Sequence, residues 1–166
     1  MTRKMAFFLL ILLAGLALDQ VTKYMVVNTM PLGYQIPLIP GFFNLVHIHN
    51  RGAAFGLLAN WSLSFTRVFF IATTGVVVAV VGYLWWRLPA GQWQAGLGYS
   101  LIITGALGNL IDRVRLGEVI DFLDFYWDGY HWPAFNVADS LVCLGAGLLV
   151  WVILREEKRA DVSSPV

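Results

Sequence analysis

The chemically versatile residues of this chain are a few carboxylates and amides set among apolar residues. Asp112, Asp121 and Asp139 each lie in a short polar motif, with Asn109 and Asn136 close by. Such groups are costly to hold in or beside a bilayer, so they indicate a functional site. Two carboxylates in a poorly hydrated site cannot both ionise easily, so one keeps its proton while the other acts as a base. Asp121 and Asp139 could thus activate water against an amide and protonate the leaving nitrogen.

Amides and a basic residue accompany these carboxylates at helical spacing. Asn109, Asp112 and Arg113 have the spacing i, i+3 and i+4, which predicts a single face of one helix. Asn136 and Asp139 repeat part of this spacing, and Asn136 is placed as an N-cap or first-turn residue. Each group alone is equally well explained as a helix cap or a structural ion pair. Their gathering at one level of the molecule favours a functional site.

Other protease chemistries have little support. The sequence contains no His-Glu-x-x-His motif for zinc, and Ser100 lacks the Gly-x-Ser-x-Gly setting of a nucleophilic serine. Cys143 is the single cysteine, which excludes an internal disulfide, and its apolar surroundings predict a small buried side chain. His47 and His49 would share one face of a strand, but no third metal ligand is evident nearby, so their role stays open. We predict no cofactor and no metal.

The composition indicates an integral membrane protein. The chain of 166 residues is 58% hydrophobic and 13% charged, whereas soluble domains have about 25% charged residues. The net charge of +1, without a basic stripe, gives no support to nucleic acid binding. The predicted fold is mainly α, a single domain (1–166) with four transmembrane helices of about the length that spans a bilayer. These spans lie near residues 5–27, 68–86, 92–111 and 134–154.

The segments between the spans are predicted to be outer loops at residues 28–66 and 112–133. Within the first loop, residues 42–49 are rich in β-forming residues and partly alternate, which predicts a strand. A turn rich in small residues follows at 50–56 and suits close approach by a ligand. Four spans place both termini on one side, and the basic flank of the first span predicts that this side is the cytoplasm. The carboxylates then gather at the outer interface.

Two charged residues interrupt the first apolar block. Asp19 and Lys23 are i, i+4 neighbours that can pair, which lowers the cost of both near the membrane. The basic start and the apolar run 5–18 would also fit a cleaved signal peptide. No clean small-x-small cleavage site precedes Asp19, and apolar residues resume after Lys23, so we expect a retained helix.

Small residues on the second and third spans predict close helix packing, as is usual in membranes. Gly75 and Ala79 have the small-xxx-small spacing, and Gly105 with Gly108 would let a second helix approach.

A proton-coupled membrane carrier is the alternative function, because carriers also use intramembrane aspartates. A carrier would need charges near the middle of the membrane and a pathway on both sides. Here the acids gather at one face, and the cytoplasmic halves of the spans are nearly all apolar, which favours the peptidase.

The polar motifs together resemble those of the bacterial lipoprotein signal peptidases, or signal peptidase II. The match extends over nearly the whole chain, in order, without a departure at a functional position, although we expect residue 51 to vary. Five blocks carry it: Asp19-Gln20-Val21-Thr22-Lys23, Asn50-Arg51-Gly52-Ala53-Ala54-Phe55, Gly105-Ala106-Leu107-Gly108-Asn109-Leu110-Ile111-Asp112-Arg113, Val119-Ile120-Asp121-Phe122 and Phe135-Asn136-Val137-Ala138-Asp139.

The resemblance implies an aspartic endopeptidase of the bacterial inner membrane, with its active site at the periplasmic face. It would cut signal peptides from diacylglyceryl-modified prolipoproteins among the membrane lipids, and cyclic peptide antibiotics would inhibit it. By position in the motifs, the catalytic pair would be Asp121 and Asp139. The substrate-binding residues would be Asn50, Gly52, Asn109, Arg113 and Asn136. The supporting residues would be Asp19, Lys23 and Asp112.

Overall fold

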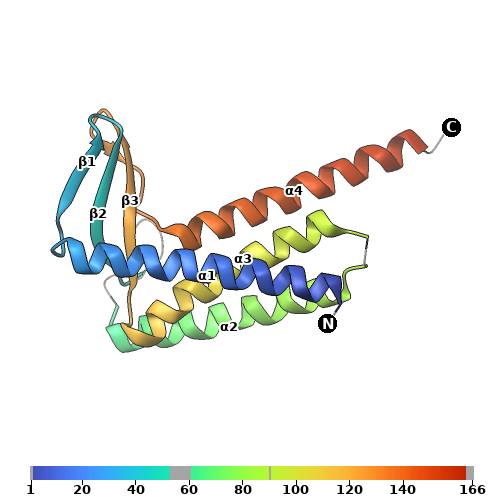
Figure 1. Cartoon of the computed structure of the whole chain (residues 1–166), viewed down its shortest axis with the longest axis horizontal. Coiled ribbons are helices and arrows are strands. Elements are labelled where there is room, and N and C mark those ends of the chain that lie inside the picture. Colours follow the sequence, from blue (N-terminus) through green and yellow to red (C-terminus); the bar gives the residue numbers. More distant parts are fainter. Residues whose placement is uncertain (1, 53–60, 90, 164–166) are drawn as a thin grey trace.

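The computed structural model describes residues 2–52, 61–89 and 91–163 of the chain, with side chains up to residue 158. The later part of the predicted turn, residues 53–56, therefore lies outside the described residues. Four long helices lie alongside one another, and a small sheet stands at one end of them, as Figure 1 shows. The elements are α1 (Arg3–Thr29), β1 (Gln35–Ile39), β2 (Phe43–Asn50), α2 (Leu63–Arg87), α3 (Trp93–Arg115), β3 (Val119–Trp127), β4 (Tyr130–His131) and α4 (Val137–Ser163).

Side-chain caps define the starts of the first two helices. Thr2 accepts a hydrogen bond from the amide of Met5 at the start of α1, and Ser62 accepts one from Phe65 at the start of α2. At the other end of α2, the Lys4 ammonium donates to the carbonyl oxygens of Trp85, Trp86 and the C-cap residue Leu88. This contact joins the start of α1 to the end of α2, where a cation is favoured by the helix dipole.

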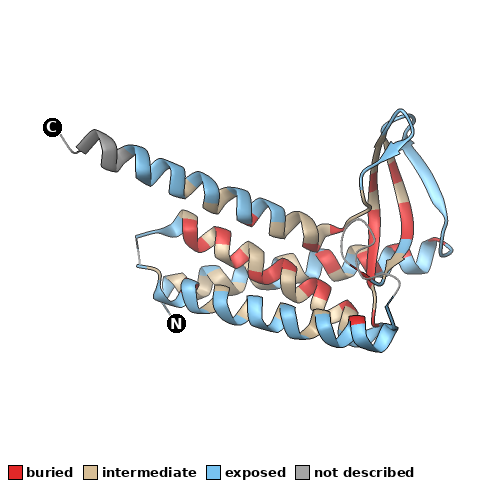
Figure 2. Cartoon of the chain, turned by 180° about the vertical axis from the view of Figure 1, so that it is seen from behind, coloured by how far each residue is buried: buried red, intermediate tan, exposed pale blue. Residues whose placement is uncertain are grey.

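Helix α3 is the interior helix, because it contacts α1, α2 and α4. Buried residues concentrate on α3 and on strands β2 and β3, while the other helices expose apolar surface (Figure 2). A Cβ atom on Gly105 would overlap the backbone oxygen of Ala138 on α4, and one on Gly108 would lie 2.7 Å from a carboxylate oxygen of Asp19 on α1. The close approach expected at these two glycines is confirmed. The expectation for Gly75 is wrong, because no atom lies within 4 Å of its Cβ position.

Three helices in the described part of the chain are long and apolar enough to cross a membrane: α1, α2 and residues 137–158 of α4. Helix α3 is as long as a span, at 23 residues, but glycine, serine, threonine and amide side chains lower its hydropathy. These are the residues that suit a helix surrounded by other helices. The observed α4 begins three residues later than predicted and continues past residue 154 to Ser163.

The sheet is antiparallel in the order β1-β2-β3-β4. The predicted strand at 42–49 is confirmed as β2. Within the segment 112–133, which was predicted as an outer loop, strands β3 and β4 were not predicted, and Asp112 lies within α3. Asp121 and Asp124 interrupt the apolar alternation of β3, but each accepts a hydrogen bond from an asparagine of β2, so the strand tolerates them.

A small apolar core fixes the sheet to the helices. Val26 and Met30 at the end of α1 pack with Phe122 of β3, and Leu45 of β2 and Val137 of α4 pack around them. Because Phe122 follows Asp121 directly, this packing sets the height of Asp121 relative to α1 and α4.

Candidate active site

A buried lysine organises the polar interior. The Lys23 side chain is only 2% exposed, and its ammonium contacts Asp112 at 2.7 Å and Asp19 at 3.0 Å. It donates its third hydrogen bond to Oδ1 of Asn109, also at 3.0 Å. All three donors of the ammonium therefore have partners, which is what a buried charge requires. The predicted pairing of Asp19 with Lys23 is confirmed, and it extends to a second carboxylate.

The two carboxylates of this cluster also accept hydrogen bonds from backbone amides. Asp19 accepts the amide of Ala138 at 2.9 Å, in the first turn of α4, and Asp112 accepts the amide of Ile120 at 3.3 Å, on β3. Gln20 donates to both carboxylates, at 3.1 Å each. The cluster thus fixes the backbone positions directly before Asp121 and Asp139.

Asn109 connects the cluster to Asp139. Its oxygen accepts from Lys23, and its nitrogen donates to Oδ1 of Asp139 at 2.7 Å. The same oxygen also accepts from Nδ2 of Asn136 at 3.1 Å. Asn109 is therefore oriented by two donors, so that its amide nitrogen faces Asp139.

Asn136 connects the two aspartates of the predicted pair. It caps α4, because its side chain accepts the amide of Asp139 at 3.0 Å while Asp139 accepts the amide of Asn136 at 3.2 Å. Its Nδ2 donates to Oδ1 of Asp121 at 2.8 Å. Asn136 itself is fully buried. Asn136 was predicted as an N-cap or first-turn residue of the last helix, and the structure shows it as the N-cap.

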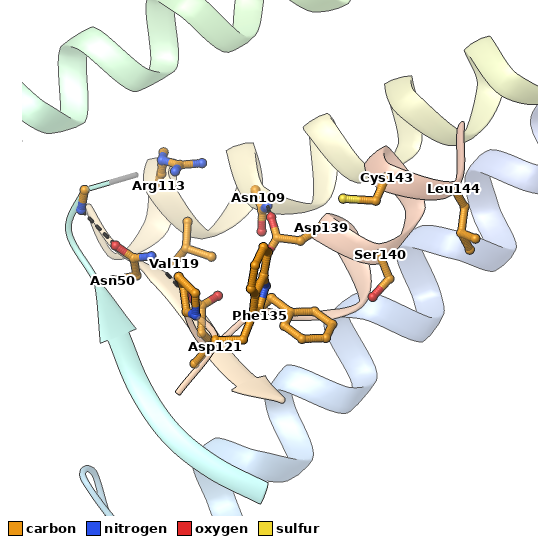
Figure 3. A pocket seen from close by; sticks show the side chains of 14 residues that line it. Asn50, Asn109, Arg113, Val119, Asp121, Phe135, Asp139, Ser140, Cys143 and Leu144 are labelled. Carbon is orange, nitrogen blue, oxygen red and sulfur yellow. Dashed lines mark hydrogen bonds between the residues drawn. The ribbon is translucent and has the colours of Figure 1, made fainter. Parts of the chain in front are cut away.

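Asp121 receives a second amide from the sheet. Nδ2 of Asn50 donates to Oδ2 of Asp121 at 3.0 Å, and Oδ1 of Asn50 accepts the amide of Gly52 at 3.0 Å (Figure 3). The Gly52 amide therefore fixes which way the Asn50 carboxamide points. Each oxygen of Asp121 faces one asparagine.

Both aspartates open onto one cavity of about 670 Å³. Its wall is mostly apolar, and Figure 3 shows the polar residues on it converging from β2, α3, β3 and α4. The Arg113 side chain lies on this wall, with its guanidinium 4.7 Å from the ring centre of Phe70 on α2. The lining residues are Asn50, Gly52, Asn109, Arg113, Val119, Asp121, Trp132, Pro133, Ala134, Phe135, Asp139, Ser140, Cys143 and Leu144.

The electrostatic setting of Asp121 favours a retained proton. Burial, together with the nearby carboxyl of Asp139, raises the pKa of Asp121 from 3.8 to about 7. Hydrogen bonds from Asn50 and Asn136 oppose the rise, as does the charge of Lys23. Near neutral pH the site can therefore hold one proton, which is the condition for acid and base chemistry at one place.

The structure brings together all ten residues predicted for the site or its support, but not on the faces expected. Asn109, Asp112 and Arg113 do not share one environment: Asp112 turns to Lys23, Arg113 turns to the cavity, and Asn109 lies between. Asp121 lies on a strand, not in a loop. The prediction for Cys143 is wrong, because its side chain is exposed on the cavity wall.

Other contributors were not predicted from the sequence. Gln20 supports both carboxylates of the lysine cluster, and its place directly after Asp19 was the available signal. Trp132 and Phe135 line the cavity, but aromatic residues near a membrane surface have many other uses. His47 and His49 do face each other, with their rings 5.2 Å apart. Among the described residues, no group of three histidine, cysteine or acidic side chains could hold a metal ion.

Comparison with known proteins gives a consistent result. A family model described as signal peptidase (SPase) II matches residues 11–155. The lipoprotein signal peptidase of Geobacter metallireducens is 48% identical over 152 residues, covering 92% of this chain and 93% of its own. That of Geobacter sulfurreducens is 50% identical over 149 residues, covering 90% and 92%. A solved bacterial membrane enzyme superposes with a TM-score of 0.85 at 34% identity, covering 97% of this chain and 94% of its own.

Replacing the buried lysine should cost stability. Lys23→Ala leaves Asp19 and Asp112 buried without their cation, so the free energy of unfolding in detergent should fall by about 3–5 kcal/mol. Arg113→Ala is the matched control: it also removes a cation, but from the cavity wall, and should leave unfolding close to that of the wild type. A larger loss of stability in Arg113→Ala would show that support and site have been assigned the wrong way round.

The raised pKa of Asp121 predicts a pH-dependent effect on stability. Between its ordinary value of 3.8 and its folded value of about 7, the folded state holds a proton that the unfolded state has released. This carboxyl therefore makes the fold less stable as the pH rises through that range. Asp121→Asn removes the titration, so its stability relative to the wild type should increase from about pH 5 to about pH 8, by at most about 3 kcal/mol.

The measurement is unfolding in detergent at both pH values. Asp128→Asn serves as the control, because Asp128 is an exposed carboxyl in the turn before β4. A stability difference for Asp121→Asn that does not change with pH would contradict the prediction.

Proposed function

The chain belongs to the signal peptidase II family, the lipoprotein signal peptidases, and we propose that it cleaves its substrates with Asp121 and Asp139 as an aspartic dyad. Membership makes it a membrane-embedded peptidase that removes signal peptides from lipoproteins. The main support for the dyad is that both carboxyl groups border one cavity. Asn136 is hydrogen-bonded to both of them. The carrier alternative is set aside, because the family consists of peptidases.

In the proposed mechanism Asp139 acts first as the base. It lies in the first turn of α4, where the helix dipole favours a negative charge, and it accepts hydrogen bonds from Asn109 and Asn136. Asp121, with its pKa near 7, holds the proton. Asp139 takes a proton from water as the water oxygen attacks the scissile carbonyl, and Asp121 gives its proton to the carbonyl oxygen.

The tetrahedral intermediate then collapses with the reverse transfers. Asp139 gives its proton to the leaving nitrogen, while a hydroxyl of the intermediate returns a proton to Asp121, and the carbon–nitrogen bond breaks. The pair ends with the one proton with which it began, so no further group is needed to reset it. Asn109 and Asn136 keep both carboxyl groups oriented through the two steps.

The remaining predicted site residues would bind the substrate. Asn50, Gly52 and Arg113 lie on the cavity wall around the dyad. The Arg113 guanidinium, oriented by Phe70, can donate to a carbonyl oxygen of the peptide or to an ester oxygen of a lipid. Arg113→Ala should therefore reduce turnover while sparing the fold. The cavity is also where a cyclic peptide antibiotic would block the enzyme.

We propose that the substrate is a prolipoprotein whose cysteine already carries a diacylglyceryl group. The cavity wall is mostly apolar and extends down α4 to Leu144, which can accommodate acyl chains next to the dyad. Acyl chains anchored in the membrane would hold the scissile bond at the level of Asp121 and Asp139 and so raise its effective concentration. The outer segment 28–66, which supplies β1 and β2, would hold the peptide from above.

Cleavage by purified protein tests this proposal. The wild type should cleave a diacylated prolipoprotein and leave its unmodified form intact. Asp121→Asn and Asp139→Asn should each abolish turnover while retaining substrate binding, and the double variant should be no worse than either single one, because residues that act as a unit are non-additive.

Asp124→Asn is the matched control. Like Asp121, Asp124 lies on β3 and accepts a hydrogen bond from an asparagine of β2, but it borders neither aspartate of the dyad. It should retain turnover. Substantial turnover by either dyad variant, checked for deamidation of the new asparagine, would overturn the mechanism. Cleavage of the unmodified protein at the same rate would overturn the substrate.

We further propose that α3 crosses the membrane with the other three helices, that the membrane is the bacterial inner membrane, and that both termini are cytoplasmic. Helix α3 lies alongside three apolar helices and matches them in length, which supports four spans. The sheet and the dyad would then face the periplasm.

Labelling of a single introduced cysteine tests this topology. In a Cys143→Ser background, Tyr130→Cys in the exposed β4 should react with an impermeant reagent added to the periplasmic side. Arg87→Cys, at the opposite end of the helices, should react only after the cytoplasmic side is opened. The reverse pattern would contradict the proposed orientation.

A further inference from the structure

Asn50 reaches Asp121 from the last residue of a strand. β2 ends at Asn50, which is paired with Val119, the first residue of β3. The pairing of β2 with β3 is irregular between Leu45 and Ile48, so only three residue pairs hold this end of β2. The position of the Asn50 carboxamide over Asp121 therefore needs support beyond the ladder.

The neighbours of Asn50 on both sides supply a second connection. Successive side chains of a strand point to opposite faces, so His49 of β2 lies on the face away from Asn50. Arg51 follows β2 directly. Two cavities reflect this division: Asn50 borders the large cavity with Asp121, whereas His49 borders a separate cavity of about 140 Å³ between α1 and the end of α3.

Both of these neighbours bind the same carboxylate. Nδ1 of His49 lies 3.1 Å from Oε2 of Glu118, and Nε of Arg51 donates to Oε1 of Glu118 at 2.7 Å. Glu118 is only 12% exposed although Arg51 is 61% exposed. Glu118 directly precedes β3, three residues before Asp121. One carboxylate, directly before the strand that carries Asp121, thus holds the residues on both sides of Asn50.

A chain of hydrogen bonds connects His49 to the end of α1 and so supports its contact with Glu118. Nδ1 of His47 lies 2.8 Å from the carbonyl oxygen of Met30, and Nε2 of His47 lies 3.2 Å from Nε2 of His49. The chain is fully satisfied when His47 donates to Met30 and His49 donates through both ring nitrogens, to His47 and to Glu118. Glu118 then accepts one hydrogen bond from His49 and one from Arg51.

We propose that Glu118 is a positioning residue of the active site, which sets the Asn50 carboxamide over Asp121 by holding His49 and Arg51. The inference rests on the proposed function of the dyad. Glu118 borders neither the dyad nor its cavity, so it acts through Asn50 alone.

The proposal has a signature in the pH profile. The hydrogen bond from Asn50 lowers the pKa of Asp121, against burial and Asp139, which raise it. The other charged groups that face the dyad are Lys23 on α1 and Arg113 on α3, and neither contacts Glu118. Displacing Asn50 therefore moves the alkaline limb of the turnover profile, where Asp121 loses its proton, to higher pH.

The experiment compares Glu118→Ala, Glu118→Gln, Asn50→Ala and the double variant Asn50→Ala/Glu118→Ala, with lipidated substrate across a pH range. Loss of the Asn50 donor should reduce kcat about a hundredfold. Glu118→Ala should reduce it about tenfold, through displacement of that donor. The double variant should match Asn50→Ala. Glu118→Gln keeps an acceptor for Arg51, and its amide nitrogen can donate to Nδ1 of His49 when His49 donates through Nε2 alone, so its kcat should stay near that of the wild type.

The two substitutions at Glu118 remove the same charge, so the difference between them reports position. The alkaline limb should lie at higher pH in Glu118→Ala than in Glu118→Gln. Glu157→Ala, an exposed glutamate of α4, is the control and should change neither kcat nor the profile. If Glu118→Ala lowers kcat further in the Asn50→Ala background, or if it behaves as Glu118→Gln does, the proposal is overturned. A wild type that fails to cleave the lipidated substrate would instead refute the proposed function.

Discussion

The structure depends on one buried ammonium group. The Lys23 side chain is only 2% exposed, so its charge depends on Asp19, Asp112 and Asn109, which occupy all three of its donors. These partners come from α1 and α3, and the two carboxylates reach on to the first turn of α4 and to β3. A displacement of any of these elements by an ångström would leave a charge or a backbone amide unpaired. The cluster therefore fixes the relative positions of four elements more tightly than apolar contacts, which tolerate sliding, could do.

Around this cluster apolar side chains lie on the outside and polar side chains in the interior, which is the reverse of a soluble protein. Helices α1, α2 and α4 expose their apolar side chains, whereas the interior helix α3 carries glycines, hydroxyls, amides and Asp112. In lipid, apolar contacts give little net attraction between helices, so close packing and buried hydrogen bonds must hold them together. Gly105 and Gly108 allow α4 and α1 to approach α3 at the level of the site. The same glycines thus permit the short distances on which Asn109 and Asp19 depend.

The sequence predicted the parts of this arrangement that rest on local rules. The apolar blocks predicted three spans that the structure supports, the i, i+4 spacing predicted the Asp19–Lys23 pair, and Asn136 was placed as a helix cap. It did not predict β3, because Asp121 and Asp124 look like loop residues until their asparagine partners on β2 are known. The sequence also did not predict that Asp112 and Arg113 point into different environments. Their spacing fits one helical face, and only the position of Lys23 on another helix explains why Asp112 turns away from the cavity. Glu118 gave no signal, since its two partners lie about seventy residues earlier in the chain.

The separate placement of charged groups and amides supports the proposal that Asp121 and Asp139 share a proton. If the Lys23 ammonium contacted Asp121 or Asp139 directly, it would hold that carboxyl ionised, and the pair would lose its acid. Its donors are instead taken by Asp19, Asp112 and Asn109, so the dyad is held by uncharged amides from Asn50, Asn109 and Asn136. A carboxamide passes on orientation without adding charge, because it accepts on one side and donates on the other. The Lys23 cluster can thus be strongly charged and rigid, while burial keeps the pKa of Asp121 near 7, where one proton can move.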